Sequence, residues 1–190
     1  MSRLWYILKT MLTKADIKWL NHLSNSKKVK IVPYNPKVKS MFEKQRKEIL
    51  GILGQNIKVL HFGASGLGIS GQKEIDVVIP TSLNNFDKFI EKLKRIYGEP
   101  RSFSPGNRVR FNHKQSDINI EIVIVNKNSE GWKRNLEFDL YLRTHPEALE
   151  AYRKLKESYH GMGIRKYYRK KMEFINDILA CMISSITPSQ

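Results

Sequence analysis

The sequence predicts an α+β (α/β) fold in which helices flank a mixed β-sheet and a helical subregion forms the C-terminal part. Segments with the two-residue period of strands alternate with segments of helical period through residues 29–128, and helical periods alone continue through residues 129–190. A chain of 190 residues is long enough for one packed domain. We therefore predict a single domain at residues 29–190, preceded by a helical appendage at residues 1–28.

The first elements follow from capping residues and periodicity. Within the appendage, Thr13 is expected to cap a short helix. Residues 28–32 alternate as a short strand, and apolar residues recur at helical spacing over residues 38–53, before Gly54. A strand and a helix are thus expected ahead of the central part of the sheet.

The next two strands enclose a segment rich in small residues. A strand at residues 59–62 runs into a loop at residues 63–71, and a second strand follows at Glu74–Ile79, closed by Pro80. The order strand, glycine-rich loop, strand is the part of the pattern that bears on function.

The remaining elements complete the sheet and the helical C-terminal part. An amphipathic helix is expected at residues 86–97, because Gly98 and Pro100 stop it. Strands are expected at residues 108–113 and 118–125, and the pattern is helical after Ser129.

Charge points to polyanionic partners. The chain has 34 Lys and Arg against 18 Asp and Glu, a formal charge of +16. Such a surface attracts nucleic acids, nucleotides and anionic membranes, and ordinary solubility charge is the alternative.

The single cysteine, Cys181, excludes an internal disulfide and a cysteine-rich zinc site. No apolar run has transmembrane length, so we expect a cytoplasmic protein without membrane insertion.

An acidic pair opens the second strand of the central pattern. Residues two apart in a strand point to the same face, so Glu74 and Asp76 share one face and the apolar Ile75 and Val77 share the other. Two such carboxylates repel one another unless a cation lies between them. In phosphoryl and nucleotidyl transfer, such carboxylates bind a pair of Mg²⁺ ions about 3.5–4 Å apart. A solvated strand face is the alternative.

A third acid interrupts the later strand. Glu121 lies in a segment whose end is apolar on both faces, where a charge is costly unless it is paired or bound to a metal. We predict that Glu74, Asp76 and Glu121 together bind Mg²⁺ or Mn²⁺ and form the catalytic site. The alternative for Glu121 is an ion pair with Arg108 or Arg110.

The small-residue loop suits phosphate binding. Glycines allow backbone N–H groups to approach a triphosphate, and the Ser65 hydroxyl can donate to it. We therefore expect Gly63, Ala64, Ser65 and Lys73 to bind a nucleoside triphosphate. By itself such a loop is more often just a turn, but the loop followed by three acids is a more specific pattern.

These residues resemble the nucleotidyltransferase superfamily of DNA polymerase beta and poly(A) polymerase, with its Gly-Ser loop, acid-x-acid pair and third acid. The chain is similar to the GrpB-like branch over about Val29 to Ile178. The matching elements are Val32–Pro36, His61–Ser65, Ile75–Asp76, Trp132–Phe138, Tyr141–Pro146, Tyr167, Lys171 and Phe174–Ile175. The resemblance implies that Tyr167 and Lys171, on a C-terminal helix, contact the triphosphate or base. A solvated or structural position on the helix is the alternative.

The chain departs from the GrpB-like pattern at two acids. Glu74 stands where those proteins tend to have an aliphatic residue, and Glu121 stands where they tend to have a histidine. The loop also lacks their Val-Pro-Gly and Lys-Pro sequences. The two acids move the site toward the three-acid pattern of active transferases.

The favoured function is transfer of a nucleoside monophosphate from a triphosphate, usually ATP, to an acceptor. The positive charge favours RNA as acceptor, although the fold alone does not identify one. The main alternative is a nucleotide- or RNA-binding protein without turnover. An interaction module on the C-terminal helices ranks last.

Overall fold

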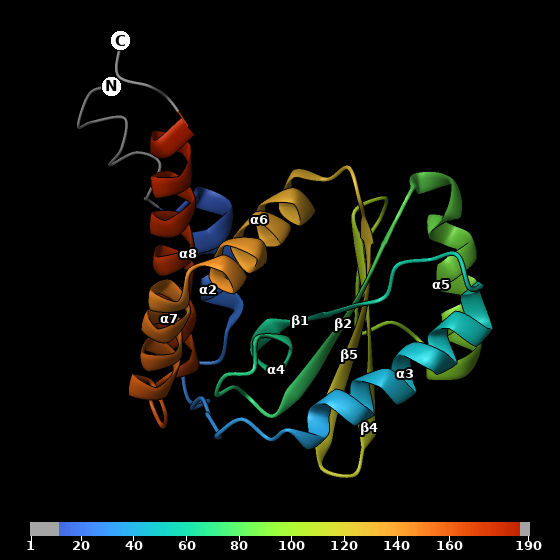
Figure 1. The fold of residues 1–190 in the computed structure, drawn as a ribbon, viewed down its shortest axis with the longest axis horizontal. Coiled ribbons are helices and arrows are strands. Elements are labelled where there is room, and N and C mark those ends of the chain that lie inside the picture. Colours follow the sequence, from blue (N-terminus) through green and yellow to red (C-terminus); the bar gives the residue numbers. More distant parts are fainter. Residues whose placement is uncertain (1–11, 187–190) are drawn as a thin grey trace. The chain divides into compact units, whose positions relative to one another are not determined.

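The computed structural model describes residues 12–186, and its central feature is a five-stranded mixed sheet with the order β1-β2-β5-β4-β3 (Figure 1). Strand β2 pairs in parallel with β5, whereas β1 with β2, β4 with β5 and β3 with β4 pair antiparallel. The predicted α+β fold class is confirmed. The strands are β1 (Leu60–Phe62), β2 (Glu74–Thr81), β3 (Ser102–Ser104), β4 (Arg108–Gln115) and β5 (Ile118–Asn126).

Two amphipathic helices, α3 (Lys37–Leu53) and α5 (Leu83–Tyr97), cover one face of the sheet (Figure 1). Their buried positions recur at three- and four-residue spacing, as Phe86, Phe89, Ile90 and Leu93 do in α5. Burial of each large apolar side chain stabilises the fold by roughly 1.5–3 kcal/mol. The sheet residues beneath these helices include Ile75, Val77, Ile79, Val109, Phe111, Ile120, Ile122 and Ile124.

The opposite face of the sheet is only partly apolar. Trp132 of helix α6 (Glu130–Thr144) packs there with Val78, Val123 and Val125. These valines lie in the C-terminal halves of β2 and β5, so the N-terminal halves of both strands keep a polar surface on this face. The short helix α4 (Gly63–Leu67) connects β1 toward β2.

The contacts divide the chain into two compact units. The sheet unit is Val32–Asp139, and the terminal unit combines Met1–Ile31 with Leu140–Gln190. This division differs from the predicted appendage at residues 1–28, and the predicted domain boundaries stay a prediction. Helix α6 continues across the division at residue 139.

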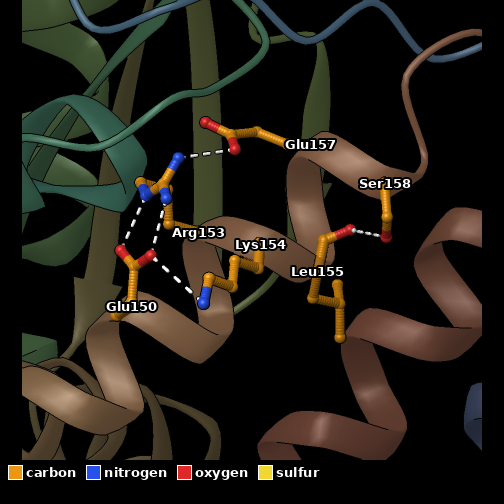
Figure 2. A network of polar contacts seen from close by, with 6 residues as sticks. All are labelled: Glu150, Arg153, Lys154, Leu155, Glu157 and Ser158. Carbon is orange, nitrogen blue, oxygen red and sulfur yellow. Dashed lines mark hydrogen bonds and ion pairs between the residues drawn. The ribbon is translucent and has the colours of Figure 1, made fainter.

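In the terminal unit the described helices are α2 (Lys14–His22), α7 (Pro146–Ser158) and α8 (Ile164–Ile186). Thr13 caps α2 in a capping box with Asp16, as the sequence predicts. Helix α7 carries a partly exposed network in which Arg153 donates hydrogen bonds to Glu150 and Glu157 (Figure 2). No helix within residues 12–186 is both long and apolar enough to cross a membrane.

Three local predictions need correction. The strand expected at residues 28–32 is present only as two isolated bridges, Lys28 with Gly163 and Val32 with Gly71. The small-residue segment expected to be a loop begins with helix α4. Strand β3 has no counterpart among the predicted elements, because its three residues are all exposed and give no alternation.

Candidate functional site

Strands β2 and β5 bring two of the predicted acids together. Asp76 is the direct register partner of Glu121 in the parallel pair, and Glu74 is the partner of Asn119. Neighbouring strands lie about 4.8 Å apart, and residues two apart point to one face. Glu74, Asp76 and Glu121 therefore share the polar face of the sheet.

Two arginines of β4 compensate these acids. Arg110 donates from Nη1 to both carboxylate oxygens of Glu121, at 3.2 and 3.4 Å, and the Glu121 side chain is only 12% exposed. Arg108 keeps contact with solvent, yet loss of water around its guanidinium and the charge of Arg110 lower its pKa. The carboxylates of Glu121 and Asp76 oppose that shift. The ion pair considered as an alternative for Glu121 is thus present.

The acids fit a magnesium site that has one or two carboxylate ligands better than a site that has three. Within residues 12–186, no three His, Cys, Asp or Glu side chains are grouped closely enough to hold one metal ion. Mg²⁺ usually binds proteins through one or two carboxylates and completes its shell with water and phosphate. Asp76 and Glu121, paired across adjacent strands, match that donor set, although Glu121 would have to exchange Arg110 for the cation.

Helix α4 is held closely against Asp76. Gly63 has a φ of +68°, and any Cβ at this position would collide with the Asp76 carboxylate. Glycine is therefore required here for two reasons, its backbone conformation and its contact. Ser65 is buried, and its Oγ lies 3.0 Å from His61 Nε2, whose ring stacks on Phe42. Ala64 follows Gly63 in the same turn, and its side chain lies so close to Gly71 that a Cβ at position 71 would collide with it.

A pocket of about 320 Å³ opens beside this turn in the sheet unit. It is lined by three of the predicted residues, Ser65, Lys73 and Glu74, and Lys73 forms an ion pair with Asp117. The hydroxyl of Tyr34, which also lines the pocket, is buried without a hydrogen-bond partner in the part of the chain described. A buried hydroxyl without a partner costs free energy, so binding of a ligand that accepts a hydrogen bond from it would be favoured.

Two of these residues, Tyr34 and Asp117, lie in no functional motif that the sequence shows. Tyr34 lies within the matching segment Val32–Pro36, and that match was its only signal. Asp117 lies in the turn between β4 and β5, where acidic residues are common for structural reasons.

Tyr167 and Lys171 lie in the terminal unit, whereas the acids lie in the sheet unit. Tyr167 is fully buried in an apolar cluster with Val29 and Ile31, and Lys156 donates to its hydroxyl at 3.0 Å. This position favours the structural alternative for Tyr167. Lys171 lies over the ring of Tyr168, 5.6 Å from its centroid, and its contact with a ligand stays a prediction.

Comparison with known proteins gives one family. A family model described as GrpB protein matches residues 28–180. The glutamate-rich protein GrpB of Alkalihalophilus pseudofirmus is 25% identical over 167 residues, which cover 82% of this chain and 96% of that protein. The UPF0157 protein YqkA of Bacillus subtilis is 25% identical over 169 residues. That match covers 81% of this chain and 47% of YqkA, so the chain spans about half the length of that relative.

One solved structure shares the fold over most of its length. The crystal structure of the conserved protein GrpB from Enterococcus faecalis is similar with a TM-score of 0.64 and 22% sequence identity. The match covers 81% of this chain and 98% of that chain. At this identity the likeness shows the fold.

Proposed function

Because the chain belongs to the GrpB family and β2 and β5 bring Asp76 and Glu121 side by side, we propose that it is a magnesium-dependent nucleotidyltransferase. It would transfer a nucleoside monophosphate from a triphosphate, usually ATP, to an acceptor. The pairing of Asp76 with Glu121 is the observation that carries the proposal, because two carboxylates on adjacent strands match the donor set of a magnesium site.

Each predicted residue has a role in this proposal. Asp76 and Glu121 would hold Mg²⁺ or Mn²⁺, with Glu74 beside them on the same face, and the metal would supply neutralising charge for the phosphates. Gly63 and Ala64 would let the triphosphate approach the backbone, and Ser65 would donate from its hydroxyl. Lys73 would exchange Asp117 for a phosphate oxygen. Lys171, which is partly exposed, would contact the triphosphate or base, and Tyr167, which is fully buried, would support its helix.

The acceptor reacts by displacement at the α-phosphorus. Its oxygen forms the new P–O bond, the bond to the β-phosphate breaks, and pyrophosphate leaves with the electron pair. Glu121 would take the proton of the acceptor, which requires that Arg110 first release this carboxylate. The charge of +16 favours RNA as the acceptor.

The second candidate is binding without turnover. The Arg110–Glu121 ion pair favours it, because a paired carboxylate is a weaker base and a weaker metal ligand. In this case the pocket beside Ser65 would hold a nucleotide, and the acids would serve only to orient it.

Release of pyrophosphate distinguishes the two candidates. The protein is incubated with each nucleoside triphosphate, Mg²⁺ or Mn²⁺, and total RNA or a metabolite pool, and compared with Glu121→Gln. Glu137→Gln, which changes an exposed acid of α6 outside the pocket beside Ser65, is the matched control. If the protein is a transferase, the parent and Glu137→Gln should release pyrophosphate and Glu121→Gln should not. Tight triphosphate binding without release in any mixture would support the binding protein instead.

Salt dependence tests RNA as the acceptor. Displacement of condensed counterions gives a log–log slope of about −0.7 per phosphate contacted on a single strand. Binding of single-stranded RNA or tRNA should therefore weaken by ~10²-fold or more between roughly 50 and 200 mM salt. Absence of binding at the low-salt end would remove RNA as the favoured acceptor.

A further inference from the structure

A second pocket, of about 550 Å³, lies in the sheet unit at the end of β2 opposite to the acids. Asp76 and Thr81 are separated by about 16 Å along an extended strand. Pockets of this volume are typical of small-molecule sites. The lining residues come from the segment before β1, the ends of β2 and β5, and helices α5 and α6: Asn56, Ile57, Lys58, Leu60, Pro80, Thr81, Ser82, Asn85, Phe89, Lys127, Trp132 and Leu136.

The charge of this pocket is positive. Lys58 and Lys127 line it, and its lining includes no aspartate or glutamate. Both lysines are exposed, and neither forms an ion pair with any residue that the structure describes. The pocket beside Ser65 differs, because its lysine is already paired with Asp117. The second pocket therefore favours an anion.

The backbone adds donors at the same place. Helix α5 begins at Leu83 directly after β2, and its N-cap residue Ser82 forms no side-chain cap hydrogen bond. The first N–H groups of a helix lack partners within the helix, and the helix dipole favours negative charge there. Ser82 and Asn85 both line the pocket. The helix start thus lies at the pocket that both lysines line.

The Thr81 hydroxyl is the independent observation that points to a ligand. Thr81 is only 5% exposed and lines the pocket, and its Oγ1, which is accessible, forms no hydrogen bond within residues 12–186. Its backbone C=O accepts from Lys127 N–H at 2.9 Å, so strand pairing accounts for the carbonyl and leaves the hydroxyl unused. A hydroxyl that lines a pocket takes its hydrogen-bond partner from the pocket, which makes an oxygen of a bound molecule its expected partner.

We propose that this pocket binds the phosphate group of a phosphorylated small molecule. Lys58 and Lys127 neutralise the phosphate, the α5 N-terminus and Thr81 donate hydrogen bonds to it, and Phe89, Trp132 and Leu136 contact the organic part. Phosphate at a helix N-terminus, with lysines beside it, is a recurrent mode of anion binding. The site is separate from the proposed nucleotide site and does not depend on it.

An NMR titration of isotopically labelled protein with phosphate compounds tests the proposal. Inorganic phosphate and ribose 5-phosphate are added in the presence of EDTA and constant ionic strength, which keeps magnesium-dependent binding out of the measurement. The amide signals of Leu83 and Asn84 are expected to shift. Tighter binding of ribose 5-phosphate would identify a sugar phosphate as the source, and equal binding would identify the phosphate alone.

Paired variants separate the pocket from general charge. The double variant Lys58→Gln with Lys127→Gln should weaken phosphate binding by about tenfold or more, because it removes two charged hydrogen-bond donors to the phosphate. Lys47→Gln with Lys88→Gln removes the same charge from exposed positions outside the pocket and should change affinity by less than about twofold. Thr81→Val should weaken binding, and Thr81→Ser, which keeps the hydroxyl, should not.

Three outcomes would overturn the proposal. They are absence of any shift at Leu83 and Asn84 at millimolar phosphate, equal weakening in the two lysine pairs, and unchanged binding in Thr81→Val. All of these positions except Thr81 are exposed, so the lysine variants are expected to fold, and thermal unfolding of each variant checks this.

Discussion

The two ends of strand β2 carry opposite chemistry although one apolar strand joins them. At its start, Glu74 and Asp76 lie beside Glu121, and at its end Thr81 lines one pocket together with Lys58 and Lys127. The residues between are mostly buried, so a charge there would be costly. Polar groups are thus confined to the strand ends and to one partly open face, where the two proposed sites lie. A cation suits the first end and an anion suits the second.

The largest expected effect is loss of nucleotide binding at the acidic end. Asp76→Asn should weaken binding of Mg-ATP by about 100-fold or more, because it removes a ligand of a hard cation. Isothermal calorimetry with and without Mg²⁺ measures this. Asp87→Asn, an exposed acid of α5, is the control and should bind as the parent does. Mg-ATP affinity unchanged in Asp76→Asn would show that Asp76 is not a ligand.

Stability at the acidic end depends on a single glycine. Gly63→Ala should lower the free energy of unfolding by about 1–3 kcal/mol, since it combines a positive φ with a collision against Asp76. Gly51→Ala is the control, because Gly51 lies in α3 with open space around it. That change should raise the free energy of unfolding by roughly 0.5–1 kcal/mol. Denaturant unfolding of both variants tests the contrast, and equal effects would contradict it.

The Arg110–Glu121 ion pair should have a moderate effect. Arg110→Gln or Glu121→Gln alone should destabilise the fold by roughly 1–3 kcal/mol, because each leaves a partly buried partner unpaired. The double variant should lose less than the sum of the single losses. A double-mutant cycle in denaturant measures the coupling, and strictly additive losses would mean that the pair does not interact.

The smallest effect is expected for charges that face water. In α7, Arg153 lowers the pKa of Glu150 through a hydrogen bond, and the stabilisation this implies is lost as pH falls through that lowered pKa (Figure 2). Arg153→Gln should return the pKa of Glu150 toward its ordinary value with little change in global stability. An NMR pH titration of the Glu150 carboxyl checks the shift. A large loss of stability would show that exposed networks matter as much as the sheet pair.

Much of the fold was predictable because the apolar periods are clean. The period of α5 and the alternation of β2 identified both elements to within a few residues. The strand expected at residues 28–32 failed for an instructive reason. Val29 and Ile31 are indeed buried, but they pack against Tyr167 instead of pairing along a strand. Alternation reports burial on one side, and it does not report hydrogen-bond partners.

The site was less predictable than the fold. The shared face of Glu74 and Asp76 follows from strand geometry alone. The pairing of Glu121 with Arg110 depends on the register of β4 with β5, which the turn at Ser116 and Asp117 sets and no period reveals. Lys58 and Lys127 are distant in sequence and lie in no motif, so their common pocket emerges only when the strands are assembled.

The division of the chain into units has a consequence for synthesis on the ribosome. The sheet unit is one continuous stretch, Val32–Asp139, whereas the terminal unit needs both ends of the sequence. Its contacts include His160, whose Nδ1 lies 2.8 and 3.1 Å from the backbone O and N of Ile31. The early segment must therefore wait for residues made much later, while the sheet unit can fold as soon as it emerges. Both pockets lie within that first-completed unit, so a nascent chain would form them before Ile31 contacts His160.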